Sequence, residues 1–231
     1  MTSEATKPLH KLDMTKAHQI YRNAAGKRVP GVTTILGFVA KPHLIKWANN
    51  LGLEGIDSSK FVDQMATIGT IAHAFCECHV QGMELDTSNL NPEHVDKAES
   101  SAIRFMAWWD SMGFKLLHSE LQMVSEDWQV GGTLDIVAVD PDGKIWVIDL
   151  KTSKAIYPEH LVQCCAYAEM FEETHGDAGP VDVRAVVRIG KTEDDDDFEV
   201  KTVNHPHIAT EYFGILVDAY RAKQRCERAN K

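Results

Sequence analysis

The architecture of the chain can be inferred first from residues 131–151, which read GGTLDIVAVDPDGKIWVIDLK. Two runs rich in Val, Ile and Leu lie on either side of the segment Asp140–Gly143. An Asp-Pro-Asp-Gly sequence between two such runs is typical of a tight turn. The stretch therefore predicts an antiparallel hairpin whose strands cover 129–139 and 144–151.

The register of this hairpin brings two carboxylates face to face. If the turn is centred on Asp142, position 139 pairs with 145 and 137 with 147, which sets Asp135 opposite Asp149. Facing residues in a strand pair have Cβ atoms about 4.5 to 5.5 Å apart. Two carboxylates at that distance repel each other, and burying them without a partner is costly. We therefore expect a cation between them.

The same sheet face carries a lysine, because Lys151 is two residues from Asp149 and side chains alternate along a strand. Carboxylate oxygens are ligands for a hard divalent ion such as Mg²⁺ or Mn²⁺. The alternative is a salt-bridged cluster of Asp and Lys on a solvated sheet face, since structural ion pairs give the same pattern. The spacing alone leaves both interpretations open.

The segments outside the hairpin predict an α/β fold, a mixed β-sheet flanked by helices. Strand-like runs cover 115–125, 181–189 and 198–203, and helical patterns cover 42–52, 61–80, 92–112, 158–175 and 206–231. A regular βαβ alternation is absent, which disfavours a doubly wound dinucleotide-binding fold. At the N-terminus, 18–23 and 27–32 predict a further hairpin with Gly26 at its turn. We expect one domain over 1–231, with 1–16 flexible and 17–60 forming a basic hairpin and helical arm.

Composition indicates an ordinary globular protein, with 44% hydrophobic and 25% charged residues in 231. The five cysteines have no framework spacing and no leader opens the chain, so we expect a reducing, cytoplasmic compartment. No apolar run approaches the roughly 20 residues that cross a bilayer, so no membrane span is expected.

The net charge of the whole chain is −10, yet the charges of residues 1–60 sum to +5. This N-terminal quarter is the candidate polyanion surface, or else a solvated basic face.

Four short motifs follow one another along the chain. They are Val32–Leu36 with Trp47, Gly69–His73, Asp135 with Asp149-Leu150-Lys151, and Gln163 with Tyr167. In this order they resemble the motifs of the RecB-like PD-(D/E)xK nucleases, and in particular the phage and mitochondrial-maintenance exonucleases of that group. The resemblance runs from about residue 17 to about residue 190. It implies a restriction-endonuclease-like catalytic core within 61–231.

The resemblance implies a role for each residue of the signature. Asp135, Asp149, the backbone carbonyl of Leu150 and His73 would hold Mg²⁺ or Mn²⁺, and Lys151 would hold the attacking water. His73 shares a helix face with Glu77, four residues away; the alternative is a core histidine. Glu120 would be a supporting ligand, or else a solvent-facing strand carboxylate.

Substrate contacts are expected from several other residues. Gln163 and Tyr167 are four apart on one helix face, although Tyr167 could simply pack in the core. Arg188 would reach a phosphate from a later strand, and the basic candidates Lys27, Arg28, Lys41 and Lys46 would bind the DNA backbone. Asp194–Asp197 is interpreted as a solvated loop with no role.

The remaining cysteine patterns favour no further cofactor. Some RecB-like relatives carry an iron-sulfur cluster on one upstream and three C-terminal cysteines, but only Cys226 follows Cys165, so no cluster is expected. A zinc site from His73, Cys76, Cys78 and His79 is disfavoured, because consecutive helical positions fan around the axis.

The sequence thus predicts a metal-dependent DNA exonuclease of replication, recombination or repair, with a protein of those processes as a partner. The resemblance to phage enzymes also suggests that a phage encodes it. A structure-specific or restriction-type endonuclease is the first alternative, and a catalytically silent DNA-binding module the second. The oligomeric state is left open.

Overall fold

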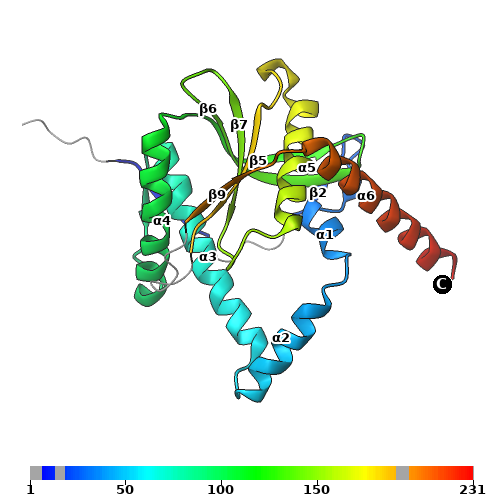
Figure 1. The fold of residues 1–231 in the computed structure, drawn as a ribbon, viewed down its shortest axis with the longest axis horizontal. Helices are drawn as coiled ribbons and strands as arrows, with labels where there is room; N and C mark the ends of the chain where they lie inside the picture. The colour runs from blue at the N-terminus through cyan, green and yellow to red at the C-terminus, as the bar shows by residue number, and fades with distance from the viewer. Residues whose placement is uncertain (1–6, 14–18, 191–197, 231) are drawn as a thin grey trace, which may run out of the picture.

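A five-stranded mixed sheet forms the centre of the computed structural model, which describes residues 7–13, 19–190 and 198–230 (Figure 1). In spatial order the strands are β5 (Lys115–Ser125), β6 (Val130–Val139), β7 (Ile145–Lys151), β8 (Val183–Arg188) and β9 (Glu199–Thr202). Among the neighbouring strands of this sheet, β7 and β8 run parallel and the other pairs antiparallel; helix α5 (Pro158–Thr174) connects β7 and β8 as a crossover. The expected mixed sheet is confirmed.

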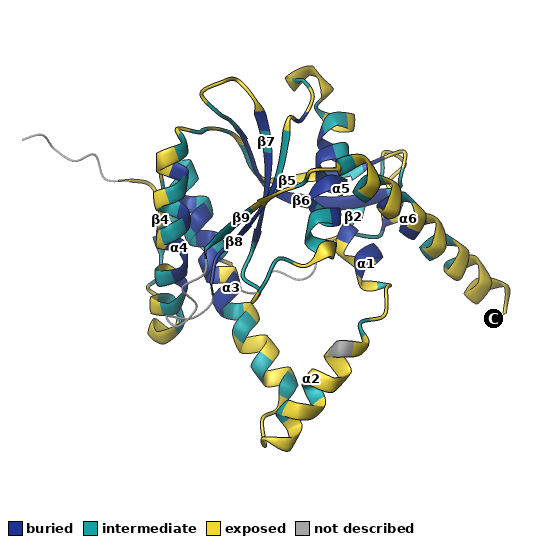
Figure 2. Ribbon diagram, viewed as in Figure 1, coloured by how far each residue is buried: buried dark blue, intermediate teal, exposed yellow. Residues whose placement is uncertain are grey.

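Helices cover both faces of this sheet (Figure 1). On one face lie α3 (Ser58–Gln81) and α4 (Pro92–Met112), and on the other lie α1 (Val32–Gly37), α5 and α6 (Pro206–Ala229). Each layer buries its own apolar cluster, one around Ile71, Phe105 and Ile148 and the other around Val147, Phe171 and Phe213. Helix α2 (Pro42–Leu53) and the C-terminal half of α6 are largely exposed (Figure 2).

Capping residues explain where the long helices begin and end. The Asp57 side chain accepts hydrogen bonds from the Ser59 and Lys60 N–H groups, so α3 begins three residues before the expected Phe61. Asn91 caps α4, as expected. Both helices end at a glycine in the left-handed region, Gly82 (φ 68°) and Gly113 (φ 64°).

The predicted register of the central hairpin is confirmed as far as its ladder extends. Val139 pairs with Ile145 and Val137 with Val147. The ladder ends at Ile136 and Ile148, one residue before the two aspartates. Gly143 occupies the turn with φ 82°.

The N-terminal region departs from expectation in two places. Strands β2 (Tyr21–Arg22) and β3 (Arg28–Val29) form the predicted hairpin around Gly26, but residues from Val32 onward form α1 rather than continuing the strand. Within the segment 1–16, which was expected to be flexible, β1 (Leu9–Lys11) pairs in parallel with β4 (Glu84–Asp86). A three-residue strand with a distant partner leaves no periodic pattern to recognise.

A short 3₁₀ turn, η1 (Gly176–Ala178), follows α5. No helix among the described residues is both long and apolar enough to cross a membrane. The acidic segment Asp194–Asp197 lies outside the described residues.

Candidate active site

The two aspartates of the hairpin lie where β6 and β7 separate. Beyond the last ladder pair, Oδ2 of Asp135 accepts a hydrogen bond from the Leu150 N–H at 2.7 Å. A side chain of β6 thus takes the place that a backbone carbonyl would have in a continuing ladder. This bond holds Asp135 beside the segment that carries Asp149.

The Lys151 ammonium contacts an oxygen of Asp149 and the backbone carbonyl of Leu150. Its Nζ lies 2.5 Å from Oδ2 of Asp149, and the same ammonium donates a hydrogen bond to the Leu150 carbonyl at 3.3 Å. Burial disfavours the charged ammonium, but Asp149 and Asp135 outweigh burial and raise the pKa of Lys151. Lys151 is therefore charged and lies against two of the oxygens that were expected to hold an ion.

The site carries more negative charge than Lys151 can offset. Asp149 is 1% exposed, and its Oδ1 has no hydrogen-bond partner within the described chain. Burial is the main cause that raises the pKa of Asp149 to about 6; Lys151 and His73 act against this shift, and Asp135 adds to it. Burial likewise raises the pKa of Asp135, with Glu77 adding to the effect. Burying such groups is unfavourable unless a cation joins them.

A divalent metal ion fits this donor set. Two carboxylates and a backbone carbonyl are the hard oxygen ligands that Mg²⁺ and Mn²⁺ prefer, and the buried Oδ1 of Asp149 is an acceptor without a partner among the described residues. In the part of the chain that the structure describes, no three His, Cys, Asp or Glu side chains already converge as a metal cluster. Lys151 contacts Oδ2 of Asp149 and the Leu150 carbonyl, so an ion that used these two oxygens would compete with its ammonium for them.

Helix α3 brings two more side chains to the carboxylates. His73 lowers the pKa of Asp149 and Glu77 raises that of Asp135, which places one near each aspartate. The close approach depends on Gly69, since a Cβ there would lie 2.6 Å from Oγ1 of Thr152, directly after β7. Glu77 had no role in the sequence-based prediction, although its spacing from His73 was the signal that could have assigned one.

Glu120 lies on β5, opposite Asp135 of the neighbouring strand β6. The flanking pairs, Ser119 with Ile136 and Leu121 with Leu134, set Glu120 opposite Asp135. Its backbone has φ 48°, a left-handed conformation that is uncommon outside glycine and that clusters at functional sites. Glu120 is exposed, so it lies at the rim of the site and not among the buried carboxylates.

Helix α5 forms the opposite wall. Gln163 Nε2 donates to the hydroxyl oxygen of Tyr167 at 2.9 Å. Burial, followed by the charge of Asp149, raises the pKa of Tyr167 well above its usual value, so its hydroxyl stays protonated. Tyr167 is 4% exposed and packs against Gly132, where a Cβ would lie 2.5 Å from the ring. It therefore both packs in the core and faces the carboxylates.

One residue of α5 was not singled out from the sequence. Burial, with the charge of Lys151 adding to it, lowers the pKa of His160 to about 4, so this imidazole is neutral at pH 7. Its Nδ1 accepts the Tyr157 N–H at 3.2 Å. Only its position three residues before Gln163 pointed to the site.

The other candidates for substrate binding lie in different surroundings. Lys41 forms a salt bridge of 2.7 Å with Glu159, and Lys46 is exposed on α2. Arg188 is 3% exposed, with its Nε 3.5 Å from Glu199 Oε2. The structure thus pairs Lys41 and Arg188 with carboxylates of the protein itself. Lys27 and Arg28 are exposed on the β2–β3 hairpin.

Comparison with known proteins identifies the family. A family model of the PD-(D/E)XK nuclease superfamily matches residues 47–227, whereas no curated protein matches the chain. Among solved structures, that of a "Putative exonuclease" from Eubacterium rectale aligns with a TM-score of 0.43 at 12% identity, over 64% of this chain and 64% of that chain. An EndoMS-dsDNA2 complex aligns with a TM-score of 0.25 at 24% identity, over 39% of this chain and 33% of that chain.

The family match covers the whole central sheet and the two helices, α3 and α5, that enclose the carboxylates. It agrees with the family inferred from the four sequence motifs and with the mixed sheet flanked by helices. Because one family model accounts for most of the chain, this protein belongs to the PD-(D/E)XK nuclease superfamily.

Proposed function

We propose that this protein is a divalent-metal-dependent DNA nuclease that hydrolyses phosphodiester bonds and acts as an exonuclease on DNA ends. One observation carries the nuclease proposal. Asp149 is almost fully buried and its Oδ1 has no hydrogen-bond partner within the described residues, beside a second carboxylate and a single lysine. This arrangement is explained if a cation is part of the working site.

The ion would be held by Asp135, Asp149, the Leu150 carbonyl and His73, with Glu120 as a supporting ligand. When bound, Mg²⁺ or Mn²⁺ supplies an activated water and offsets the charge that develops on the phosphate. Asp135 already accepts the Leu150 N–H, so one of its oxygens orients the strand while the other remains for the ion.

Lys151 would position the nucleophile. Its ammonium lies against Asp149 and the Leu150 carbonyl, and its raised pKa keeps it charged. As a compact point charge with three donors, it can hold the attacking water and offset charge on the scissile phosphate.

Tyr167 and Gln163 would bind the substrate beside the ion. Since Gln163 donates to the Tyr167 oxygen, the phenolic O–H is left to donate to a phosphate oxygen. The raised pKa of Tyr167 supports this direction of donation.

The preference for ends rests on the resemblance of the motifs to exonucleases. A structure-specific or restriction-type endonuclease is the rival, and a catalytically silent DNA-binding module is the rival from another class. The cytoplasmic location, the phage origin and a recombination or replication partner stay predictions.

Product size tests the proposal. Linear DNA labelled at one end and closed circular DNA are incubated with Mg²⁺, with Mn²⁺ or with chelator. The proposal expects mononucleotides or short oligonucleotides from the linear DNA with metal, and intact circles. Cutting of closed circles would establish the endonuclease, and no metal-dependent cleavage of any DNA would favour the silent module.

A further inference from the structure

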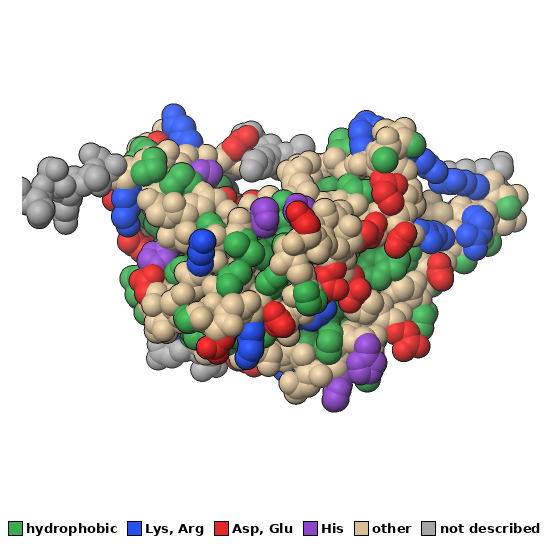
Figure 3. Space-filling model, turned by 90° about the horizontal axis from the view of Figure 1, so that it is seen from above, with side chains coloured by type: hydrophobic (Ala, Val, Ile, Leu, Met, Phe, Trp, Pro, Cys, Tyr) green, Lys and Arg blue, Asp and Glu red, His purple; other side chains and the backbone are tan. Residues whose placement is uncertain are grey.

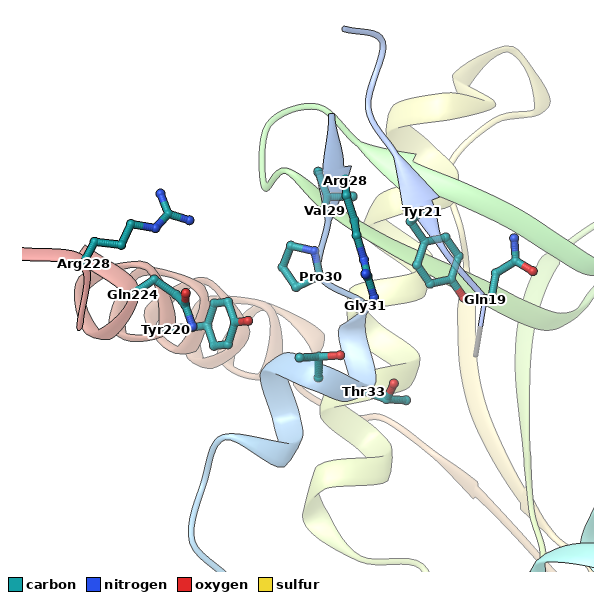
Figure 4. Close-up of a pocket in the computed structure, with 11 residues that line it drawn as sticks. Gln19, Tyr21, Arg28, Val29, Pro30, Gly31, Thr33, Tyr220, Gln224 and Arg228 are labelled. Carbon is teal, nitrogen blue, oxygen red and sulfur yellow. The ribbon is translucent and has the colours of Figure 1, made fainter. Parts of the chain in front are cut away.

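An open groove of about 710 Å³ lies between the β2–β3 hairpin and α6, two elements from opposite ends of the chain (Figure 4). Tyr21 and Arg28 line it from the hairpin, Thr33 from α1, and Tyr220 and Arg228 from α6. Among the described residues that line it, none is Asp or Glu. In a chain of net charge −10, such a groove favours an anionic ligand.

Contacts between α1 and α6 fix the shape of this groove. The rings of Phe38 and Tyr220 meet edge to face, with centroids 6.1 Å apart, and the Lys223 ammonium lies 5.1 Å from the centre of the Phe38 ring. These contacts hold the turn of α6 that carries Tyr220 and Lys223 against the end of α1, which keeps Tyr220 on the groove wall.

The basic side chains at this end of the molecule are not neutralised equally. Arg221 pairs with Asp218 at 3.5 Å and Lys223 with Glu227 at 3.8 Å. Within the described residues, Arg28 and Arg228 form no ion pair. Figure 3 shows Lys and Arg side chains gathered at the end of the molecule where α6 projects, with acidic side chains over the middle of the same face.

The groove leads toward the carboxylates. The hydroxyl groups of Tyr21 and Thr133 lie 2.9 Å apart, and Thr133 precedes Asp135 by two residues on β6. Two positions along a strand span about 7 Å. Tyr21 also lies near Tyr167. Burial and the charges of Asp149 and Asp135 are the larger causes that raise the pKa of Tyr167, and Tyr21 adds to them.

We propose that this groove binds the phosphodiester backbone of a single nucleic-acid strand next to the scissile bond. Arg28 and Arg228 contact phosphates, and the rings of Tyr21 and Tyr220 lie beside bases. Aromatic stacking requires unpaired bases, which is why a single strand and not a duplex is the occupant. The placement of the groove next to the scissile bond rests on the proposed nuclease function, but binding of a strand in the groove can be measured without cleavage.

The test compares three full-length proteins: wild type, the double variant Arg28→Ala/Arg228→Ala, and the control Arg225→Ala. Arg225 is exposed on the same helix but does not line the groove, so its loss removes one charge from that helix without touching the groove. Fluorescence anisotropy measures binding of a labelled single-stranded 20-mer and of the matching duplex, in chelator, across a salt series.

The double variant should bind the single strand about tenfold or more weakly, because two charged contacts are lost. Its log-log salt slope should be shallower by about 1.4, since each phosphate contact on a single strand contributes about 0.7. The control should keep the wild-type slope, and duplex binding should change little. An unchanged slope in the double variant, an equal loss in Arg225→Ala, or a loss confined to the duplex would each overturn the proposal.

Cleavage assays on the same proteins separate the two proposals. If wild type cleaves no DNA with Mg²⁺ but the double variant loses binding, the groove stands and the nuclease function fails. If wild type cleaves and the double variant binds and cleaves the 20-mer equally well, the groove fails and the nuclease function stands.

Discussion

Replacing Asp149 by asparagine should stabilise the metal-free protein at neutral pH. The side chain is 1% exposed, and its pKa in the fold is about 6 against an ordinary value of 3.8. A shift of about 2 units corresponds to about 3 kcal/mol of unfavourable interaction in the ionised form. Asparagine has the shape of the protonated acid without the charge, so up to about 3 kcal/mol should be recovered in Asp149→Asn.

The pH dependence follows from the direction of the shift. Because the folded protein holds the Asp149 proton more tightly than the unfolded chain, this group's contribution to stability is largest below pH 3.8 and is lost as the pH rises to about 6. The advantage of Asp149→Asn should therefore be full at pH 7.5 and small near pH 4. Urea unfolding in chelator at both pH values measures it.

A matched control lies in the same hairpin. Desolvation raises the pKa of Asp140, but hydrogen bonds from the Trp146 indole and from backbone N–H groups outweigh it, and the pKa is lowered overall. The ionised form of Asp140 is thus the stabilising one at neutral pH, and Asp140→Asn should destabilise. With Mg²⁺ at 100 times its dissociation constant, wild type should gain about 2.7 kcal/mol and Asp149→Asn little. Destabilisation by Asp149→Asn in chelator at pH 7.5 would refute the reasoning.

Three further predictions concern the surroundings of the carboxylates. Lys151→Ala should abolish cleavage yet bind Mg²⁺ as tightly as wild type or more tightly, because the ammonium lies on oxygens that the ion needs; calorimetric titration checks this, and weaker binding would contradict it. His73→Ala should raise the metal concentration for half-maximal activity more than it lowers the maximal rate, and an unchanged metal titration would make His73 a core histidine. Gly132→Ala should lower both stability and activity by displacing the Tyr167 ring, whereas Gly176→Ala, where a Cβ meets nothing within 4 Å, should be tolerated; equal effects of the two would contradict the packing.

The parts of the site that local chemistry determines were predictable from the sequence. The turn at Gly143 and the strand periodicity set the register, and the register brings Asp135 and Asp149 opposite each other, one residue beyond the last ladder pair. What alternation could not reveal is the hydrogen bond from the Leu150 N–H to Asp135. It forms only because the ladder stops one residue earlier.

Contacts between distant segments were predictable only through the motifs or not at all. His73 and Tyr167 were assigned by resemblance, because no periodic pattern says which helix face meets which end of a strand. Glu77 was missed, although it shares a helix face with His73. The Lys41–Glu159 pair joins residues far apart in sequence, so charge counting over the N-terminal quarter treated Lys41 as available to DNA.

Surface architecture shows the same limit. The C-terminal end of α6 has the composition of a solvated basic helix, and the sequence-based prediction assigned the phosphate contacts to the N-terminal quarter and to Arg188. In the structure Arg28 of that quarter and Arg228 of the last helix line one groove. A wall built from both ends of a chain leaves no signal within either segment.

Metal-dependent cleavage by matched variants tests the central claim most directly. Wild type, Asp135→Asn, Asp149→Asn and the control Asp140→Asn are compared on end-labelled linear DNA with Mg²⁺, with Mn²⁺ and with chelator, after circular dichroism has verified that each protein is folded. The account predicts cleavage by wild type and Asp140→Asn only with metal, and none by Asp135→Asn or Asp149→Asn. Cleavage that survives in a folded Asp135→Asn or Asp149→Asn protein, or that persists in chelator, would contradict it.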